Sequence, residues 1–338
     1  MTAARDDDGR RLDRIVRKAR PDLPLSLIHR LFREKRVILN GRNAGANCRV
    51  HEGDEIVLHY GEREKPAMAA APLSGSASPE NTGRLLRIVL ETPDLLILNK
   101  PAGLAVHGGG VSLNGLARSY LRGKIPASLS FTPGPLHRLD KETSGLIVFS
   151  KSLAGARSFS GALQKGMIAK TYIAIMEGTF AAGKTEVWED ALLRDRNLQK
   201  TIAGAGTGGK PARTVARPLA SAKNLSLVIV RPGTGRTHQI RAHAAAHGHP
   251  LYGDVKYGGN AGAAGGVNGR GGFFLHAMAL ELPASILGLS KNPPAGDLAA
   301  ADAGAAETVI CPPPSAFLEA VDFIGTKEKF SPSSLCKP

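Results

Sequence analysis

Apolar residues follow a helical spacing at the start of the chain. Between residues 12 and 32 they recur every three or four positions, as they do on the buried face of an amphipathic helix. The spacing predicts two helices, and Ser26 stands where the N-cap of the second helix is expected. The positions that set this spacing are Leu12, Ile15, Val16, Leu25, Ile28, Leu31 and Phe32.

A hairpin signal follows the two predicted helices. The short apolar run at 36–39 ends in Asn40 and Gly41, and Asn-Gly is the strongest short-range signal for a two-residue hairpin turn. Residues 55–59 predict one further strand. Residues 10–60 therefore predict a compact helix-helix-hairpin unit.

Beyond residue 85 the apolar residues gather in short runs, which are typical of strands. Helical patterns lie between these runs at 152–164 and 237–247, and a shorter one covers 317–323. This part of the chain therefore predicts a domain that combines strands with helices. The expected strands cover 87–90, 95–98, 146–149, 172–176 and 225–230.

Three segments poor in large apolar residues divide the chain. Residues 61–84 hold mostly Ala, Pro, Ser, Gly and Glu, which is the composition of a flexible linker. Residues 258–272 form a glycine-rich insertion, and residues 291–338 form a tail with proline-rich and polar ends. We therefore expect a small unit at 10–60, a linker, and a larger domain at 85–290 that precedes the tail.

The charge of the chain is strongly positive and unevenly distributed. The 44 Lys and Arg exceed the 29 Asp and Glu by 15 among 338 residues. Residues 10–49 alone hold 12 Lys and Arg against 3 Asp and Glu, a local excess of 9. Such an excess favours a polyanionic partner, either a nucleic acid or an anionic membrane surface.

Other features of the composition exclude several protein classes. Three scattered cysteines cannot form a disulfide scaffold and are usual in a reducing compartment. Apolar runs such as Leu95–Leu98 are far shorter than the roughly 20 residues of a membrane span. Acidic residues at 6–8 differ from the basic and apolar start of a signal peptide. We therefore expect a cytoplasmic protein without a membrane partner.

The densest polar motif covers 137–145 and contains Asp140 between Arg138 and Lys141. Nearby cations would keep the carboxyl group of Asp140 ionised, as a catalytic carboxylate needs. An isolated aspartate in such a loop is more often a turn residue, so the motif alone leaves both interpretations open.

A second motif covers 235–243 and holds Arg236 and Arg241, five residues apart. On one helix these side chains would project about 140° from each other, so one can face inward while the other meets solvent. They fit either phosphate contacts or a solvated face. His243 and His247 have the spacing of a helical zinc pair, but the alanines between them supply no general base, and we expect no metal site.

Two further features carry little weight by themselves. Tyr172 lies in an alternating strand, where a tyrosine usually packs in the core, although it could also present its ring to a flat substrate. Lys100 lies in the turn 99–103, where glycine permits close approach to a ligand.

Taken together, these motifs resemble the RluA-type ribosomal RNA pseudouridine synthases, and most closely the RluC branch. The resemblance covers residues 85 to about 285, and residues 10–60 resemble an RNA-binding module named for a small-subunit ribosomal protein. It implies an α+β fold with a mixed, mostly antiparallel sheet. The matching segments are 99–103, 105–109, 137–145, 170–172, 235–243 and 248–254.

The resemblance also implies roles for individual residues. Asp140 corresponds to the essential aspartate, Tyr172 to the tyrosine that stacks on the uracil, and Arg241 to the arginine paired with the aspartate. Arg138 corresponds to the basic residue linked to extrusion of the target nucleotide. The remaining expected RNA contacts are His137, Lys100 and Arg236 in the large domain, and Arg30, Arg33 and Arg36 in the small unit.

The implied reaction isomerises uridine in large-subunit (23S) ribosomal RNA and requires the base to leave its stack. Because nothing is oxidised or transferred, we expect no cofactor and no metal. We also expect a monomer. Asp140 could attack the ribose or remove a ribose proton. The alternatives are a non-catalytic RNA-binding or ribosome-assembly protein, and a hydrolytic N-glycosylase with Glu142 as second carboxylate.

Overall fold

The computed structural model describes residues 1–61, 86–108, 110–181, 183–204, 208–261, 272–288 and 306–324. Apart from residue 61, the expected linker lies outside the described residues, as does most of the expected insertion at 258–272. The expected tail is described at residues 306–324.

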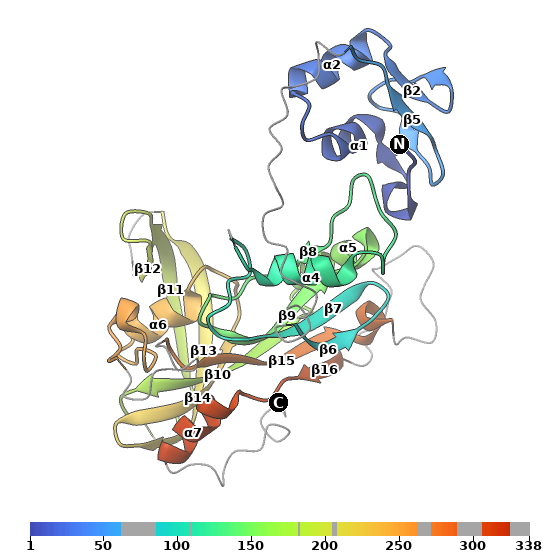
Figure 1. The fold of residues 1–338 in the computed structure, drawn as a ribbon. Helices are drawn as coiled ribbons and strands as arrows, with labels where there is room; N and C mark the ends of the chain where they lie inside the picture. Colours follow the sequence, from blue (N-terminus) through green and yellow to red (C-terminus); the bar gives the residue numbers. More distant parts are fainter. Residues whose placement is uncertain are drawn as a thin grey trace.

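The first 61 residues form a separate N-terminal module (blue in Figure 1). Its core combines apolar side chains of both helices and the small strands with Ala3, so residues before the expected start at 10 also pack on it. Asn40 and Gly41 have φ of +49° and +76° and form the predicted hairpin turn. The elements are β1 (Arg10–Arg11), α1 (Leu12–Ala19), α2 (Leu25–Arg33), β2 (Val37–Leu39), β3 (Arg42–Asn43), β4 (Arg49–Val50) and β5 (Ile56–Leu58).

The expected cap of the second helix is wrong. Helix α2 begins at Leu25, and Pro24 occupies the N-cap position without a side-chain hydrogen bond. Ser26 therefore lies inside the first turn of the helix. The fixed φ of proline suits a helix start, so no hydroxyl is needed at this end.

Eleven strands of the described chain form one sheet, and the expected α+β fold with a mixed, mostly antiparallel sheet is confirmed. The order along the sheet is β12-β11-β13-β14-β10-β15-β9-β7-β6, while β16 pairs with β15 and β8 with β9. The strands are β6 (Arg87–Glu91), β7 (Leu95–Lys100), β8 (Gly134–Pro135), β9 (Ser144–Ser150), β10 (Ala169–Glu177), β11 (Glu186–Asp195), β12 (Lys200–Ala203), β13 (Lys210–Ala222), β14 (Leu225–Pro232), β15 (Leu275–Pro283) and β16 (Ala306–Ile310).

The two halves of the sheet join at a short parallel contact between β9 and β15. Only two residue pairs form it, with Ser144 opposite His276 and Gly145 opposite Ala277. Gly145 has φ of +105°, and a Cβ atom there would lie 2.3 Å from the carbonyl oxygen of Ala277. The join therefore requires a glycine. The 137–145 motif leads directly into it.

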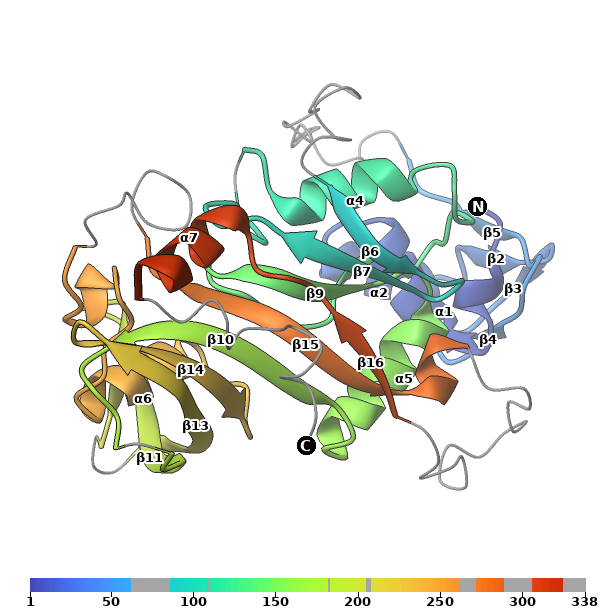
Figure 2. The ribbon, with the colours of Figure 1, turned by 90° about the horizontal axis from the view of Figure 1, so that it is seen from below.

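Helices cover both faces of the sheet (Figures 1 and 2). Helices α4 (Leu113–Leu121) and α6 (Gln239–Ala246) share one apolar cluster with Leu139 and Tyr172. Helix α5 (Leu153–Gln164) packs in a second cluster, whose strand residues alternate with those of the first. Helix α7 (Ser315–Ile324) of the expected tail packs in a third, against β10 and β14.

The N-terminal module docks on the large domain through polar contacts near its first helical turn. In Figure 1 the chain before β8 rises toward the module. There the buried carboxylate of Asp7 accepts hydrogen bonds from the backbone N–H groups of Leu129 and Ser130, at 3.0 and 2.9 Å. No helix within the described ranges has the length and apolar character to cross a membrane.

Candidate active site

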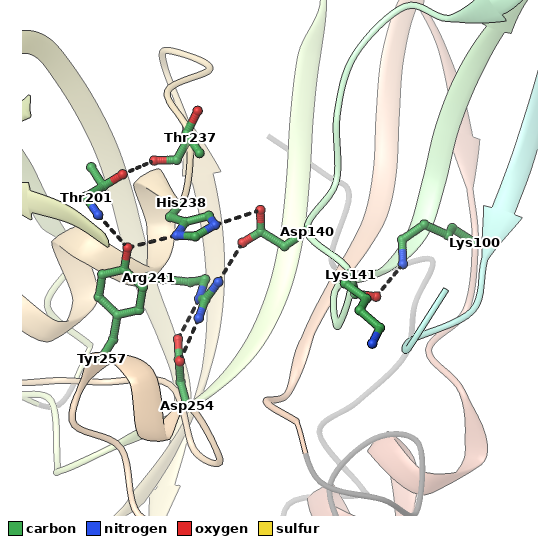
Figure 3. A network of polar contacts seen from close by, with 9 residues as sticks. All are labelled: Lys100, Asp140, Lys141, Thr201, Thr237, His238, Arg241, Asp254 and Tyr257. Carbon is green, nitrogen blue, oxygen red and sulfur yellow. Dashed lines mark hydrogen bonds and ion pairs between the residues drawn. The ribbon is translucent and has the colours of Figure 1, made fainter. Parts of the chain in front are cut away.

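Asp140 lies in the turn between β8 and β9, on the sheet face that α4 and α6 cover. The backbone N–H of Thr143 closes this turn by donating to the carbonyl of Asp140, at 3.2 Å. The carboxylate is 25% exposed, and Arg241 donates to its Oδ2 at 3.1 Å. Figure 3 shows that this arginine comes from the opposite side of the site, on α6. The two motifs singled out from the sequence therefore meet at one carboxylate.

The guanidinium of Arg241 is bound by a second carboxylate and lies against two aromatic rings. Its Nε and Nη2 groups donate to the two carboxylate oxygens of Asp254, at 2.7 and 2.8 Å. The guanidinium also lies 4.7 Å from the ring centre of Tyr257 and 4.4 Å from that of Phe273. Burial alone would lower the pKa of Arg241, but the hydrogen bonds and charges of Asp254 and Asp140 raise it overall. A permanent positive charge is thus fixed beside Asp140.

His238 approaches the second oxygen of Asp140. Its Nε2 lies 3.7 Å from Oδ1, and its Nδ1 lies 2.9 Å from the hydroxyl of Tyr257. Burial lowers the pKa of His238, against the opposing charge of Asp140, which favours a neutral ring. The hydroxyl of Tyr257 accepts from the backbone N–H of Thr201 at 2.8 Å, so its own proton is available to Nδ1. That assignment leaves the ring proton on Nε2, facing Asp140 (Figure 3).

Tyr172 lies on β10, with a residue exposure of 8%, in the same apolar cluster as Leu139 and Ile240. Burial raises the pKa of Tyr172, and the negative charge of Asp140 raises it further. The side chain therefore stays a neutral phenol.

Lys100 differs from the expected RNA contact. The residue is fully buried, and its Nζ donates to the carbonyls of Pro101, Leu104 and Lys141 at 2.9, 2.8 and 2.7 Å. Burial lowers the pKa of Lys100 to about 7, and the charges of Glu142 and Asp140 oppose the shift. Three carbonyl acceptors need all three ammonium protons. Lys100 therefore supports the turn that carries Asp140 and does not reach the surface.

His137 also has internal partners. Its Nε2 accepts from the backbone N–H of Val148 at 3.1 Å, and its ring stacks on Phe159 at 6.1 Å between centroids. Burial lowers the pKa of His137 to about 3, so the ring is neutral. These contacts direct the ring toward β9 and α5, where its partners are parts of the protein itself.

The two other expected contacts of the large domain lie at the surface. Arg138 is exposed next to Asp140 in the sequence. Arg236 is exposed and donates to the carbonyl of Pro211 at 3.2 Å. Helix α6 begins only at Gln239, so Arg236 lies in the turn before the helix. From the sequence, Arg236 and Arg241 had instead been considered on one helix.

The expected RNA contacts of the N-terminal module lie apart from the Asp140 site. Arg33 is exposed on α2. Arg30 and Arg36 lie beside Glu34, at 4.0 and 3.1 Å from its carboxylate oxygens. These three arginines thus remain surface features of the module.

The His243 and His247 pair has other partners. The Nδ1 of His243 lies 2.9 Å from the hydroxyl of Thr214, and the Nε2 of His247 lies 2.7 Å from a carboxylate oxygen of Asp190. Across the described parts of the chain, no group of three or more His, Cys, Asp or Glu side chains is placed to hold a metal ion.

Comparison with known proteins shows the family of this chain. Residues 94–246 match the family model described as RNA pseudouridylate synthase. A relative from Rickettsia bellii (strain RML369-C), named "Ribosomal large subunit pseudouridine synthase C", is 33% identical over 251 residues, which span 73% of this chain and 82% of the relative. The chain belongs to the RNA pseudouridylate synthase family.

Further relatives and solved structures support the assignment of this synthase. A protein of the same name from Escherichia coli (strain K12) is 31% identical over 285 residues, spanning 82% of this chain and 86% of the relative. The structure "Human RNA Pseudouridylate Synthase Domain Containing 1" is 25% identical, with a TM-score of 0.50 over 67% of this chain and 83% of that one. The structure "Human RNA Pseudouridylate Synthase Domain Containing 4" shares the fold, with a TM-score of 0.54, 20% identity and coverage of 73% and 95%.

Three residues that the structure brings to the candidate site were not predicted from the sequence. His238 and Asp254 stand inside the matching segments 235–243 and 248–254, but neither was assigned a role in the reaction. Tyr257 follows shortly after the second segment. Their common signal is a cluster of polar and aromatic residues in the first turn of the predicted helix 237–247 and shortly after its end.

Proposed function

We propose that this synthase isomerises uridines to pseudouridines in large-subunit (23S) ribosomal RNA, with Asp140 as its catalytic carboxylate. The observation that carries the proposal is the ion pair between the partly exposed Asp140 and the buried, doubly anchored Arg241. The names of the relatives from Rickettsia bellii and Escherichia coli supply the substrate class.

The reaction needs an ionised carboxylate beside the ribose. The bond between C1′ and N1 of the uridine breaks, the uracil turns, and C5 bonds to C1′. The proton on C5 is then lost and N1 gains one, so no group is transferred. Asp140 can act by attack on C1′ or by removal of a ribose proton. Both routes use the anion that Arg241 stabilises.

Tyr172 is suited to hold the uracil by stacking. Because its pKa is raised, the neutral phenol is a poor base for the proton on C5. An amphipathic aromatic ring in the apolar wall of the site can stack on a flat base at little entropic cost. These properties support a role of Tyr172 in binding the uracil. They do not support a role in removing the proton from C5.

Arg241 orients Asp140 by a hydrogen bond, and His238 lies beside the second carboxylate oxygen. The Nε2–H of His238 faces one oxygen, and the Nη1 of Arg241 binds the other. The hydrogen bond from Arg241 restricts rotation of the carboxylate before the reaction, whereas His238, at 3.7 Å, lies beyond hydrogen-bond distance and contributes through its place beside the second oxygen. We assign both residues as positioning groups for Asp140.

RNA contacts complete the proposal. Arg138 is exposed beside Asp140, where it can contact the extruded nucleotide, and Arg236 can contact a nearby phosphate. The N-terminal module, with exposed Arg33 and its strong positive charge, is proposed to bind structured RNA.

The substitution Asp140→Asn tests the catalytic assignment. We expect it to abolish pseudouridine formation in a 23S ribosomal RNA transcript, because the amide is neither an anion nor a nucleophile, while RNA affinity stays within about twofold. Glu142→Gln removes one charge from the same turn and serves as the control, with activity retained. Wild-type activity in Asp140→Asn would overturn the assignment, and release of free uracil by the wild type would indicate a glycosylase.

A further inference from the structure

An arginine-lined cleft lies between the N-terminal module and the large domain, away from the Asp140 site. Its volume is about 250 Å³, and none of the described residues that line it is acidic. Figures 1 and 2 both place the module next to α5, the helix that carries Arg157. The lining residues are Gly9, Arg10, Arg11, Arg14 and Arg49 from the module and Arg157 from the large domain.

The cleft owes its shape to the docking of the module. Asp7 binds the backbone of the segment before β8, and Arg10 donates to the carbonyl and the hydroxyl of Ser130 at 3.1 and 2.8 Å. The carboxylate of Asp6 accepts from the backbone N–H of Leu153 at 2.9 Å, at the start of α5. These contacts bring the arginines of the module to Arg157.

The side chains of two of the five arginines have no partner among the residues that the structure describes. Arg11 binds Asp13, Arg10 binds Ser130, and Arg49 donates to the carbonyl of Gly9. In contrast, the guanidinium groups of Arg14 and Arg157 form no hydrogen bond or ion pair with any residue that the structure describes, and both residues are exposed. Five like charges around one cleft repel each other and favour an anion between them.

We propose that this cleft binds phosphate groups of the RNA backbone and so fixes the N-terminal module and the large domain on one RNA. The proposal rests on the proposed function, because it takes ribosomal RNA as the ligand. A planar guanidinium can bind a phosphate through two parallel hydrogen bonds, and Arg14 and Arg157 offer such a fork from each side. Phosphate contacts of this kind set position and carry no sequence information.

The test compares the full-length wild type with Arg14→Gln and Arg157→Gln in binding to a 23S ribosomal RNA transcript at several KCl concentrations. Each substitution is expected to weaken binding about threefold to tenfold and to reduce the slope of log affinity against log salt by about 0.7 to 0.9. The double variant should lose less than the product of the single losses, since both side chains serve the same site. Thermal unfolding of each variant checks that the fold is retained.

Arg217→Gln is the matched control, because Arg217 is exposed on β13 and lines no part of the cleft. An equal loss in Arg217→Gln would show that only net charge matters and would overturn the proposal, as would wild-type salt slopes in Arg14→Gln and Arg157→Gln. Pseudouridine formation by the wild type is measured in parallel. If it is absent, the proposed function fails; if it is present while the cleft variants bind normally, the cleft alone is rejected.

Discussion

At the scale of single residues, Arg241 combines three tasks that only a guanidinium can perform together. It donates two hydrogen bonds to Asp254, one to Asp140, and lies close to two aromatic rings. Its side chain is 8% exposed and Asp254 is 2% exposed, so both charges have lost most of their water. Such a buried pair is costly to break from one side, because the remaining charge stays without a partner.

We therefore expect Arg241→Lys to reduce the rate of pseudouridine formation at saturating enzyme by about a hundredfold or more. An ammonium group has no planar fork, so it cannot bind both oxygens of Asp254 and reach Asp140 as well. Single-turnover assays on a 23S ribosomal RNA transcript measure this rate. The matched control is Arg217→Lys, which keeps the charge at an exposed position on β13 outside the site and should stay near the wild-type rate. An Arg241→Lys rate within a few-fold of wild type would contradict the positioning role.

Lys100 shows where residue type alone misleads. A lysine in a glycine-containing turn is usually exposed, and the turn 99–103 therefore suggested an RNA contact. Its three acceptors are backbone carbonyls, one of them at Lys141, forty-one residues away. Backbone carbonyls have no signature in the sequence, so this partnership becomes visible only in the fold.

At the scale of elements, the sequence predicted those parts whose burial is periodic. Helices α1, α2 and α5 and strands β7, β9, β10 and β14 lie where apolar spacing placed them. Strand β13 was missed because it contains Pro211 and Pro218, which argue against a strand interior. The structure accommodates Pro218 beside a register shift between β13 and β14. Helix α4 and strands β11, β12, β15 and β16 also went without a prediction.

The site was predictable in part for a similar reason. Asp140 and Arg241 stand in dense polar motifs, whose resemblance to a known family supplied their roles. The anchoring of Arg241 by Asp254, and the contact of His238 with Tyr257, depend on how the chain folds back after α6. The course of the chain after α6 is set by tertiary packing, which the local spacing of apolar residues does not predict.

The join between β9 and β15 gives a prediction at this scale. We expect Gly145→Ala to destabilise the protein by about 3 kcal/mol or more, because its Cβ would lie 2.3 Å from the carbonyl oxygen of Ala277 and φ is +105°. Urea unfolding measures the change. Gly161→Ala on α5, where the added Cβ would meet no described atom within 4 Å apart from its chain neighbours and the backbone of its own helix, should instead stabilise by about 0.5 to 1 kcal/mol. Equal effects at both glycines would show that the join tolerates a side chain.

At the scale of the whole molecule, buried histidines tie distant segments together and stay neutral. His276 on β15 is fully buried, with Nδ1 at 2.9 Å from the hydroxyl of Ser144 and Nε2 at 3.0 Å from the carbonyl of Cys311. It thereby links both halves of the sheet to the segment that precedes α7. Burial lowers the pKa of His276 to about 4 and that of His137 to about 3.

These pKa values predict a loss of stability in mild acid. Between the ordinary histidine pKa of about 6.5 and the lowered folded values, the unfolded chain binds more protons than the folded one. Stability is therefore full above pH 6.5 and falls as the pH decreases, by about 2 kcal/mol for each of the two histidines at pH 5.

The substitution His276→Gln tests this prediction through its pH dependence, independently of its effect at neutral pH. The free energy of unfolding is measured in urea at pH 7 and at pH 5 for both proteins. The loss between these two pH values should be about 2 kcal/mol smaller in His276→Gln than in the wild type, since one neutral buried histidine is gone. His29→Gln removes an exposed histidine and should leave the wild-type difference unchanged. If His276→Gln kept the full wild-type difference, the acid sensitivity would have to come from groups other than the histidine that joins the two halves of the sheet.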